Sequence, residues 1–404
     1  MNDQDVDLRS RPSGPVEPAS PRLLDGVRYC VVVFLVVRLG LSLLSVVGAH
    51  LIEPLAPVMP PGMSPVAATG GWHNIWDGTE RSDAFWFEKV ADEGYRKGDA
   101  SAAFFPLYPV AMRALSWVFG GSTLAAGLAV SNGTFLGALV VLYGLTTMEF
   151  SRSMAQRTVV LMSIFPTAFF FMAPYAESPF LLCSVSAFWF ARRDRWLLAA
   201  FAGALAALTR SIGIVLVPAL AVEAFLQWRH AGKPLVPRLN AALAVAVGPL
   251  LYLSWWQLRF RDFTAPFDAQ AYWGRTFDWP WMTVLHALRL AWDTTAAGGG
   301  GGGYWLTDVL VAGTVIGAVA VGARLLRPSY LVFAAASLIV PLSYPFPGRP
   351  FVSLPRFAAV VFPAIWVIAK AVERRPATWP IVVGSSAALY GVFVLLFVNW
   401  HVIL

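Results

Sequence analysis

The sequence predicts an all-α polytopic membrane protein, a bundle of about eleven or twelve transmembrane helices. Of its 404 residues 57% are hydrophobic and only 13% are charged, whereas a soluble protein of this size carries about a quarter charged residues. The apolar residues also come in runs that are separated by clusters of arginine, as in helices that cross a bilayer back and forth. The bilayer must therefore be the solvent for much of the chain.

The N-terminal part is predicted to contain a tail, one span and a long outer loop. Residues 1–21 are rich in Asp, Arg, Pro and Ser and are predicted to be a disordered cytoplasmic tail. The apolar run at residues 24–48 is too long for a signal peptide and is predicted to be the first span. Residues 50–103 form the outer loop. Within it, apolar residues at helical spacing from Asp83 to Asp92 predict an amphipathic helix on the membrane surface.

Residues 22–404 are predicted to form a single integral-membrane domain. Residues 104–120 are apolar but contain two prolines near their start, and we expect them to dip into or line the outer leaflet, with a full span as the alternative. A second outer loop, residues 258–305, contains the glycine run 298–303, which is predicted to be a flexible linker. Arginine clusters mark the inner ends of the remaining spans. These spans are predicted at residues 122–148, 158–174, 179–191, 196–209, 212–226, 239–257, 306–322, 328–345, 357–371 and 379–399.

Charge and composition exclude several classes of function. The net charge of +7 comes largely from Lys and Arg in the predicted inner loops, where they are orientation signals rather than a nucleic-acid face. Cys30 and Cys183 each lie in an apolar run, so no disulfide framework is expected. The five histidines show no metal-ligand spacing. The sequence therefore predicts no nucleic-acid partner, no metal and no cofactor.

A second set of polar residues maps to the predicted outer side, at or just below the membrane surface. Arginine and glutamate at such depth are costly unless they face a polar cavity or each other. An arginine can hold a phosphate by paired, charge-assisted hydrogen bonds, and a carboxylate can take a proton from an attacking hydroxyl. The set therefore predicts a site that transfers a group from a lipid phosphate. Its members are Asp83, Tyr108, Tyr175, Glu177, Arg210, Arg349 and Arg356.

Asp83 is predicted to be the general base of this site, with Arg356 or Arg210 as the phosphate holder. The alternative base is Asp77, which follows Trp76. An anionic phosphate leaving group needs charge stabilisation more than it needs a strong acid. One carboxylate and one guanidinium would therefore suffice for the reaction.

Each of these candidates also has a purely structural interpretation. Asp83 could be only the N-cap of its helix, a role that aspartate often fills. Glu177 could cap the helix that begins at Ser178, with Arg210 as its structural partner. Arg349 lies in Pro-Gly-Arg-Pro and could be a solvated loop residue. Arg356 could be an anchor at the membrane interface.

The motifs themselves resemble those of a known family. The stretch Arg81 to Tyr95 resembles the Arg-Trp-Asp-x-x-Trp-Tyr-x-x-Ile-Ala-x-x-Gly-Tyr signature of PIG-V-type mannosyltransferases, which belong to the GT-C glycosyltransferase superfamily. One position departs from the signature, because Ser82 stands where the family has Trp, and a Trp-Asp pair occurs upstream at Asp77. The signature's spacing is kept only from Asp83. Further blocks that resemble the family in the same order lie at residues 104–109, 174–178, 208–211 and 353–357, so that the resemblance covers about residues 24–370.

This resemblance implies a GT-C-like bundle and the activity of a bacterial homologue. Such an enzyme transfers mannose with inversion from a polyprenyl-phosphate-mannose donor, and the product is an α-mannoside. Its acceptor is expected to be a cell-envelope glycolipid, polysaccharide or protein. Asp83 matches the aspartate that the family uses as base. Enzymes with such donors generally need no metal. The resemblance also implies a multi-pass protein of the cell membrane, in contact with membrane lipids, whose active site faces the periplasm or exterior.

Two other functions stay open from the sequence. One is a lipid or solute transporter or flippase in which Glu177 and Arg210 form an intramembrane gate. The absence of a visible internal repeat counts against it. The other is a GT-C enzyme that uses a different lipid-phosphate sugar, because the identity of the sugar rests on the family resemblance alone.

Overall fold

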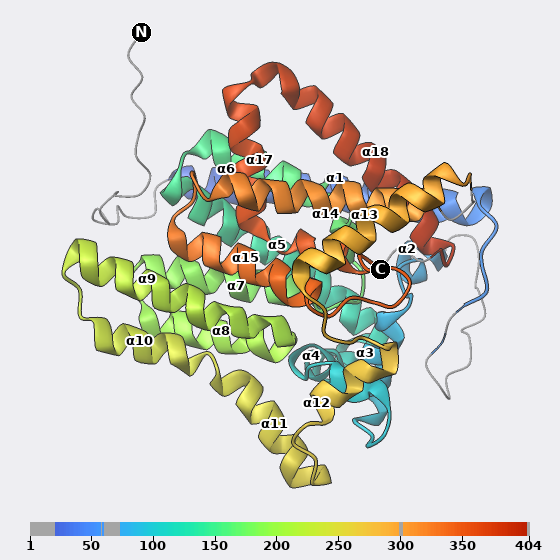
Figure 1. Ribbon diagram of the computed structural model, residues 1–404, viewed down its shortest axis with the longest axis horizontal. Coiled ribbons are helices and arrows are strands. Elements are labelled where there is room, and N and C mark those ends of the chain that lie inside the picture. The colour runs from blue at the N-terminus through green and yellow to red at the C-terminus, as the bar shows by residue number, and fades with distance from the viewer. Residues whose placement is uncertain (1–20, 58, 60–72, 299–301, 402–404) are drawn as a thin grey trace.

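Helices are the only regular secondary structure in the described parts of the chain, as the computed structural model in Figure 1 shows. The structure describes residues 21–57, 59, 73–298 and 302–401. The predicted cytoplasmic tail lies outside these residues except for its last position.

Among the described residues, six helical stretches are long and apolar enough to cross a membrane. Four of these stretches belong to α1 (Pro21–Leu51), α5 (Thr123–Glu149), α14 (Gly302–Gly322) and α18 (Trp379–Val398). The predicted all-helical polytopic membrane fold is thus confirmed. The shorter apolar helices are α8 (Trp196–Thr209) and α15 (Pro328–Leu342).

The predicted number of spans was larger because several predicted spans are broken or short. The run at residues 158–174 is divided between α6 (Arg152–Ser163) and the 3₁₀ helix η4 (Ala168–Phe171). A helix needs about 20 residues to cross the hydrocarbon core, and α7 (Glu177–Arg192) and α17 (Phe362–Arg374) are shorter than this. The remaining helices are α2 (Asn74–Asp77), α3 (Asp83–Glu93), α4 (Leu107–Ser116), α9 (Leu216–Ala231), α10 (Leu235–Ala244), α11 (Val247–Phe260), α12 (Ala265–Asp268), α13 (Pro280–Ala296) and α16 (Leu354–Ala359).

The prediction of a flexible linker over the glycine run is wrong at its C-terminal end. Helix α14 begins at Gly302, so that the last two glycines of the run are helical. Residues 299–301 lie outside the described residues. The strongly apolar sequence that follows explains the early start, because a membrane-spanning segment satisfies its backbone groups by extending the helix.

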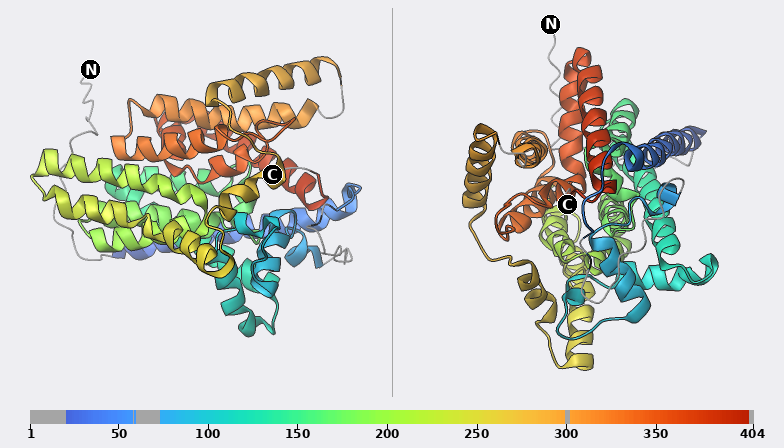
Figure 2. Two further views of the ribbon diagram at one scale, coloured as in Figure 1. Left: turned by 60° about the horizontal axis from the view of Figure 1, so that its bottom comes forward. Right: turned by 90° about the vertical axis from the view of Figure 1, so that its right-hand side faces the viewer.

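The two loops that were predicted to be outer loops meet at one end of the bundle. Helix α5 packs against α1, α4, α6 and α7, and α7 packs in turn against α8. At the end where α3 and α4 lie, the 3₁₀ helix η2 (Ala100–Ala103) of the first loop contacts α12 of the second loop. Figures 1 and 2 show α3, α4 and α12 grouped at this end. Segments about 170 residues apart in sequence thus enclose a common region.

A buried ionic network fastens four helices elsewhere in the bundle. The carboxylate of Glu223 on α9 is fully buried and accepts hydrogen bonds from Arg327 at 2.7 Å, Arg192 at 3.1 Å and Ser329 at 2.8 Å. Arg192 also pairs with Glu149 of α5 at 2.6 Å. Buried charges are tolerated when they are paired in this way. Arg192 and Arg327 were predicted only to mark the inner ends of spans, and in the structure their ion pairs also hold helices together.

Candidate active site

Helix α3 presents the residue that was predicted to be the base. Asp83 is its first residue, and the N-cap position belongs to Ser82, whose backbone is left-handed with φ 51°. The Asp83 carboxylate accepts a hydrogen bond from Arg356. Asp83 is therefore not the N-cap of its helix, and its side chain is used in a long-range contact.

Helix α3 is covered more deeply than the amphipathic pattern predicts. Residues 84–91 are all buried, including Glu88 and Lys89 of the face that was expected to be polar. Lys89 finds a partner inside the protein, since its Nζ lies 3.6 Å from the Asp99 carboxylate. Only the last turn, at Asp92 and Glu93, is exposed. The prediction that α3 lies on a membrane surface is thus wrong for most of its length, because α4 and α5 pack over it.

Four charged side chains from distant parts of the chain meet in one cluster beside α3. Arg356 Nη1 donates to Asp83 Oδ2 at 2.8 Å, although the two residues are 273 positions apart. Arg356 Nε lies 3.2 Å from Glu177 Oε1, and Glu177 also pairs with Arg210. Helix α7 begins at Glu177, and Arg210 directly follows α8. The first outer loop, two helix ends and α16 therefore build the cluster together.

The neighbouring carboxylates keep the Arg356 side chain charged. Burial disfavours a charged guanidinium, and Arg356 is only 6% exposed. The carboxylates of Asp83 and Glu177 outweigh this cost and raise the pKa of Arg356 above its ordinary value. The guanidinium also lies 5.3 Å from the centre of the Tyr175 ring. Arg356 thus stays charged and holds two carboxylates at fixed positions.

The two predicted tyrosines pack beside the cluster and against α3. Tyr175 is fully buried, and its hydroxyl donates to the carbonyl oxygen of Arg81 at 2.6 Å, just before α3 begins. Tyr108 is also fully buried and hydrogen-bonds to Gly127 and Ser131. Both rings pack edge-on against Phe87, with centroids 6.5 and 5.0 Å away. They hold α3 in place, which fixes the direction of the Asp83 side chain.

The remaining two candidates lie in other surroundings. Arg349 makes a bidentate pair with Asp308 of α14, at 2.6 and 2.9 Å. Asp77, the alternative base, is the last residue of α2, and its carbonyl oxygen accepts from Arg81 at 3.2 Å. Among the predicted site residues, the structure therefore brings Asp83, Glu177, Arg210 and Arg356 into direct contact.

Arg275 was not among the predicted site residues, yet it lies next to the cluster. It follows the 3₁₀ helix η6 (Ala269–Trp273) in the second outer loop. Burial, and then the positive charge of Arg356, lower its pKa to about 10, while Asp83 acts in the opposite direction. The only sequence signal was the general mixture of Trp, Asp and Arg in this loop, which does not separate Arg275 from its neighbours.

A buried pair of carboxyl groups lies on another side of α3. Glu80 is 5% exposed and Glu88 is 9% exposed, and the two side chains are within hydrogen-bonding reach of each other. Burial raises the pKa of Glu80 to about 7. Burial and the nearby carboxylates of Glu80 and Asp92 raise the pKa of Glu88 to about 10. Glu88 is therefore a neutral acid at pH 7, and this region of the first loop carries less negative charge than its composition indicates.

We expect Glu88→Gln to stabilise the protein at alkaline pH. Folding raises the pKa of Glu88 from 4.5 to about 10, so the native state holds more protons between these values. The free energy of unfolding therefore falls as the pH rises through this range. Glutamine stays neutral, so at about 1.4 kcal/mol per pH unit the variant should be more stable by roughly 5 kcal/mol at pH 8.5, with little difference at pH 5. Thermal unfolding in detergent at both pH values measures this.

The matched control is Glu93→Gln, which removes an exposed carboxylate from the same helix. Its thermal unfolding should keep the pH dependence of the unchanged protein. An unaltered pH dependence in Glu88→Gln would show that Glu88 is ionised in the folded protein.

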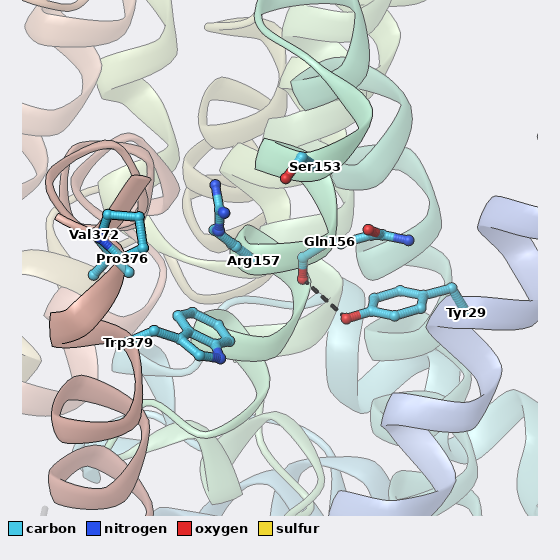
Figure 3. Close-up of a pocket in the computed structure, with 7 residues that line it drawn as sticks. All are labelled: Tyr29, Ser153, Gln156, Arg157, Val372, Pro376 and Trp379. Carbon is cyan, nitrogen blue, oxygen red and sulfur yellow. Dashed lines mark hydrogen bonds between the residues drawn. The ribbon is translucent and has the colours of Figure 1, made fainter. Parts of the chain in front are cut away.

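A cavity of about 340 Å³ lies apart from the charged cluster (Figure 3). It lies between α1, α6, α17 and α18, and the Tyr29 hydroxyl donates to the Gln156 carbonyl oxygen within it at 3.4 Å. None of the clustered residues lines it, so the chemistry of the charged groups locates the candidate site. No group of three or more His, Cys, Asp or Glu residues in the described ranges could hold a metal ion. The cavity is lined by Tyr29, Ser153, Gln156, Arg157, Val372, Pro376 and Trp379.

Solved structures of ArnT share this fold. ArnT from Cupriavidus metallidurans bound to undecaprenyl phosphate matches with a TM-score of 0.51 and 15% identity, over 91% of this chain and 76% of that chain. Its apo state matches with a TM-score of 0.51 and 16% identity, over 91% and 75%. The Archaeoglobus fulgidus oligosaccharyltransferase matches with a TM-score of 0.40 and 14% identity, over 90% and 52%. At such identities the ArnT matches show the fold alone, which is that of the GT-C glycosyltransferases.

Sequence comparison identifies the family. No curated protein matches the chain. The family model for Mannosyltransferase (PIG-V) matches residues 26–265, which is more than half of the sequence. This range contains Asp83, Glu177 and Arg210 of the cluster. The chain is therefore a glycosyltransferase of the GT-C fold and belongs to the PIG-V mannosyltransferase family.

Proposed function

We propose that this protein transfers mannose from a polyprenyl-phosphate-mannose donor to a hydroxyl group of a cell-envelope glycolipid, polysaccharide or protein. The observation that carries the proposal is the contact of Asp83, Glu177, Arg210 and Arg356 in one cluster. The family supports mannose as the sugar. A polyprenyl-phosphate carrier is supported by the ArnT structure, which has the same fold and holds undecaprenyl phosphate.

The reaction is an inverting displacement at the anomeric carbon. The acceptor oxygen forms a bond to this carbon, and the bond from the carbon to the phosphate oxygen breaks with its electron pair on the phosphate. Asp83 takes the proton of the acceptor hydroxyl as the new bond forms. Arg356 contacts Oδ2 of Asp83, so we assign Oδ1 to the acceptor. The products are an α-mannoside and polyprenyl phosphate.

The arginines act on the charge that develops in this step. Negative charge moves onto the leaving phosphate, and fixed positive groups nearby stabilise the transition state more than the ground state. Arg356 and Arg210 supply such charge, while Glu177 holds both guanidinium groups in place. Tyr108 and Tyr175 pack against Phe87 of α3 and so hold the helix that presents Asp83 to the acceptor. Arg349 has the weakest claim to the donor, because Asp308 already neutralises it.

We propose further that the cluster faces the periplasm or exterior of the cell membrane. Lys and Arg are concentrated in the loops predicted to be cytoplasmic, and a bias of this kind sets the orientation of a membrane protein. The loops that carry α3 and Arg275 then lie on the opposite side. A donor that has crossed the bilayer could approach the cluster from the outer leaflet.

The transfer assay uses the purified full-length protein with polyprenyl phosphate [¹⁴C]mannose and extracted envelope acceptors. We expect labelled mannose in the acceptor fraction and release of polyprenyl phosphate. Transfer of glucose or arabinose but not of mannose from the corresponding donors would contradict the proposed sugar. Movement of the donor across liposome membranes, without any sugar transfer, would favour the transporter or flippase function.

A further inference from the structure

The charges of the cluster balance, but Arg275 beside it adds one more. Asp83 and Glu177 are matched by Arg356 and Arg210 in the ion pairs described above. The Arg275 guanidinium donates to neutral oxygens, to the Tyr344 carbonyl at 2.9 Å and to Ser353 Oγ at 3.4 Å. Within the described residues no ion pair involves Arg275. The site therefore carries one excess positive charge when its side chains are considered alone.

Arg275 is partly buried, so its unmatched guanidinium has lost part of its hydration. Burial removes the hydration of the charge, and the neighbouring Arg356 repels it, so that the pKa of Arg275 falls to about 10. This value still leaves the side chain charged at neutral pH. Proteins normally pair a buried charge with an opposite one. An anion beside Arg275 would supply the counter-charge that these side chains lack.

The second loop places Arg275 beside the segments that carry the charged cluster. The loop that carries it packs on α3, because the ring centroids of Tyr272 and Trp273 lie 5.9 and 6.5 Å from that of Trp86. Its partner Ser353 is the N-cap of α16 and precedes Arg356 by three positions. The guanidinium thus lies between the segments that present Asp83 and Arg356. Its two hydrogen bonds use only part of its N–H donors, and the others can bind a second oxygen ligand.

We propose that Arg275 binds the phosphate group of the lipid carrier, both in the donor and in the released polyprenyl phosphate. Arg356 and Arg210 then act on the phosphate through their charge without contacting it, since their hydrogen bonds go to Asp83 and Glu177. This inference rests on the proposed function and refines it. It moves the direct phosphate contact from the arginines predicted by sequence to one in the second outer loop.

The alternative is that Arg275 has a structural role only, in which its hydrogen bonds hold the segment from Tyr344 to Ser353 in place. Arg275→Gln distinguishes the two roles, because glutamine can still donate to those oxygens but has no charge. We measure the binding of undecaprenyl phosphate, without sugar, to the purified full-length protein by native mass spectrometry and by ligand-induced thermal shift. The Kd should rise at least tenfold in Arg275→Gln. Arg275→Lys should recover part of the affinity.

Two controls complete the experiment. Arg289→Gln removes an exposed arginine on α13 and should bind undecaprenyl phosphate normally. Undecaprenol, which has no phosphate, should bind the unchanged protein and Arg275→Gln alike. In the transfer assay, the KM for the donor should rise more than kcat falls. Unchanged binding of undecaprenyl phosphate by Arg275→Gln, or an equal loss of undecaprenol binding, would overturn the proposal.

The outcome is separable from that of the proposed function. If undecaprenyl phosphate binds in an Arg275-dependent way but no mannose is transferred, the result supports the phosphate site and contradicts the proposed mannosyltransferase activity. If mannose is transferred and Arg275→Gln binds the lipid phosphate normally, the activity stands and the role of Arg275 fails.

Discussion

Asp83→Asn is expected to lower the rate of mannose transfer by about 10³-fold, in line with the loss of a positioned general base. Asparagine has nearly the same shape as aspartate but cannot take the acceptor proton. The rate of transfer from polyprenyl phosphate [¹⁴C]mannose, at saturating donor, measures the effect. Binding of undecaprenyl phosphate should change much less, because Asp83 does not contact the phosphate in the proposed mechanism.

Two further aspartates give matched comparisons for Asp83. Asp92→Asn alters the exposed end of the same helix, where the carboxylate accepts a hydrogen bond from Thr123 at 3.1 Å. It should keep nearly full activity. Asp77→Asn tests the alternative base. Full activity in Asp83→Asn, together with loss of activity in Asp77→Asn, would transfer the role of base to Asp77.

Arg356→Ala is expected to destabilise the protein by about 3–5 kcal/mol and to abolish transfer, because its removal leaves Asp83 without its ion-pair partner and leaves the buried Glu177 with Arg210 alone. Glu177 is 1% exposed, and Arg356 lies against both Glu177 and Asp83. The alanine variant also loses the contact with the Tyr175 ring. Thermal unfolding in detergent and the transfer assay measure the two effects.

A double variant separates the ion pair from general damage to the site. In a protein that already carries Asp83→Asn, the change Arg356→Ala should cost less stability, since one of the two carboxylates is gone. Arg229→Ala removes an exposed arginine at the end of α9 and should change stability by less than about 0.5 kcal/mol. Equal costs of Arg356→Ala in both backgrounds would mean that the Asp83–Arg356 contact is not energetically coupled.

The parts of the fold that depend on local sequence were predictable. The runs at residues 24–48, 122–148 and 379–399 correspond closely to α1, α5 and α18. A long apolar stretch can be recognised as a membrane-spanning helix from its hydropathy alone. The start of α3 at Asp83 was also predicted correctly. The family was predicted from several short motifs, and the match over residues 26–265 confirms it.

The features that depend on long-range contacts could not be predicted from the sequence. Glu88 and Lys89 follow a helical pattern that assigns them to water, but their partners Glu80 and Asp99 lie in the loops on either side of α3. Arg275 has no distinctive local motif, and its importance appears only once the second loop packs against α3. The contact of Asp83 with Arg356 was expected from chemistry rather than from periodicity, because transfer from a lipid phosphate needs a carboxylate and a guanidinium in one site.

Each member of the Asp83–Arg356 pair follows closely on a serine in the left-handed backbone region, with φ 51° at Ser82 and φ 67° at Ser353. Such a conformation costs a residue other than glycine about 1–3 kcal/mol, and the surrounding packing must supply this energy. The orientation of the base and its guanidinium is therefore set by two unfavourable turns. A β-branched residue at either position would misdirect the pair while the membrane-spanning helices stayed folded, so catalysis should be more sensitive to these serines than folding is.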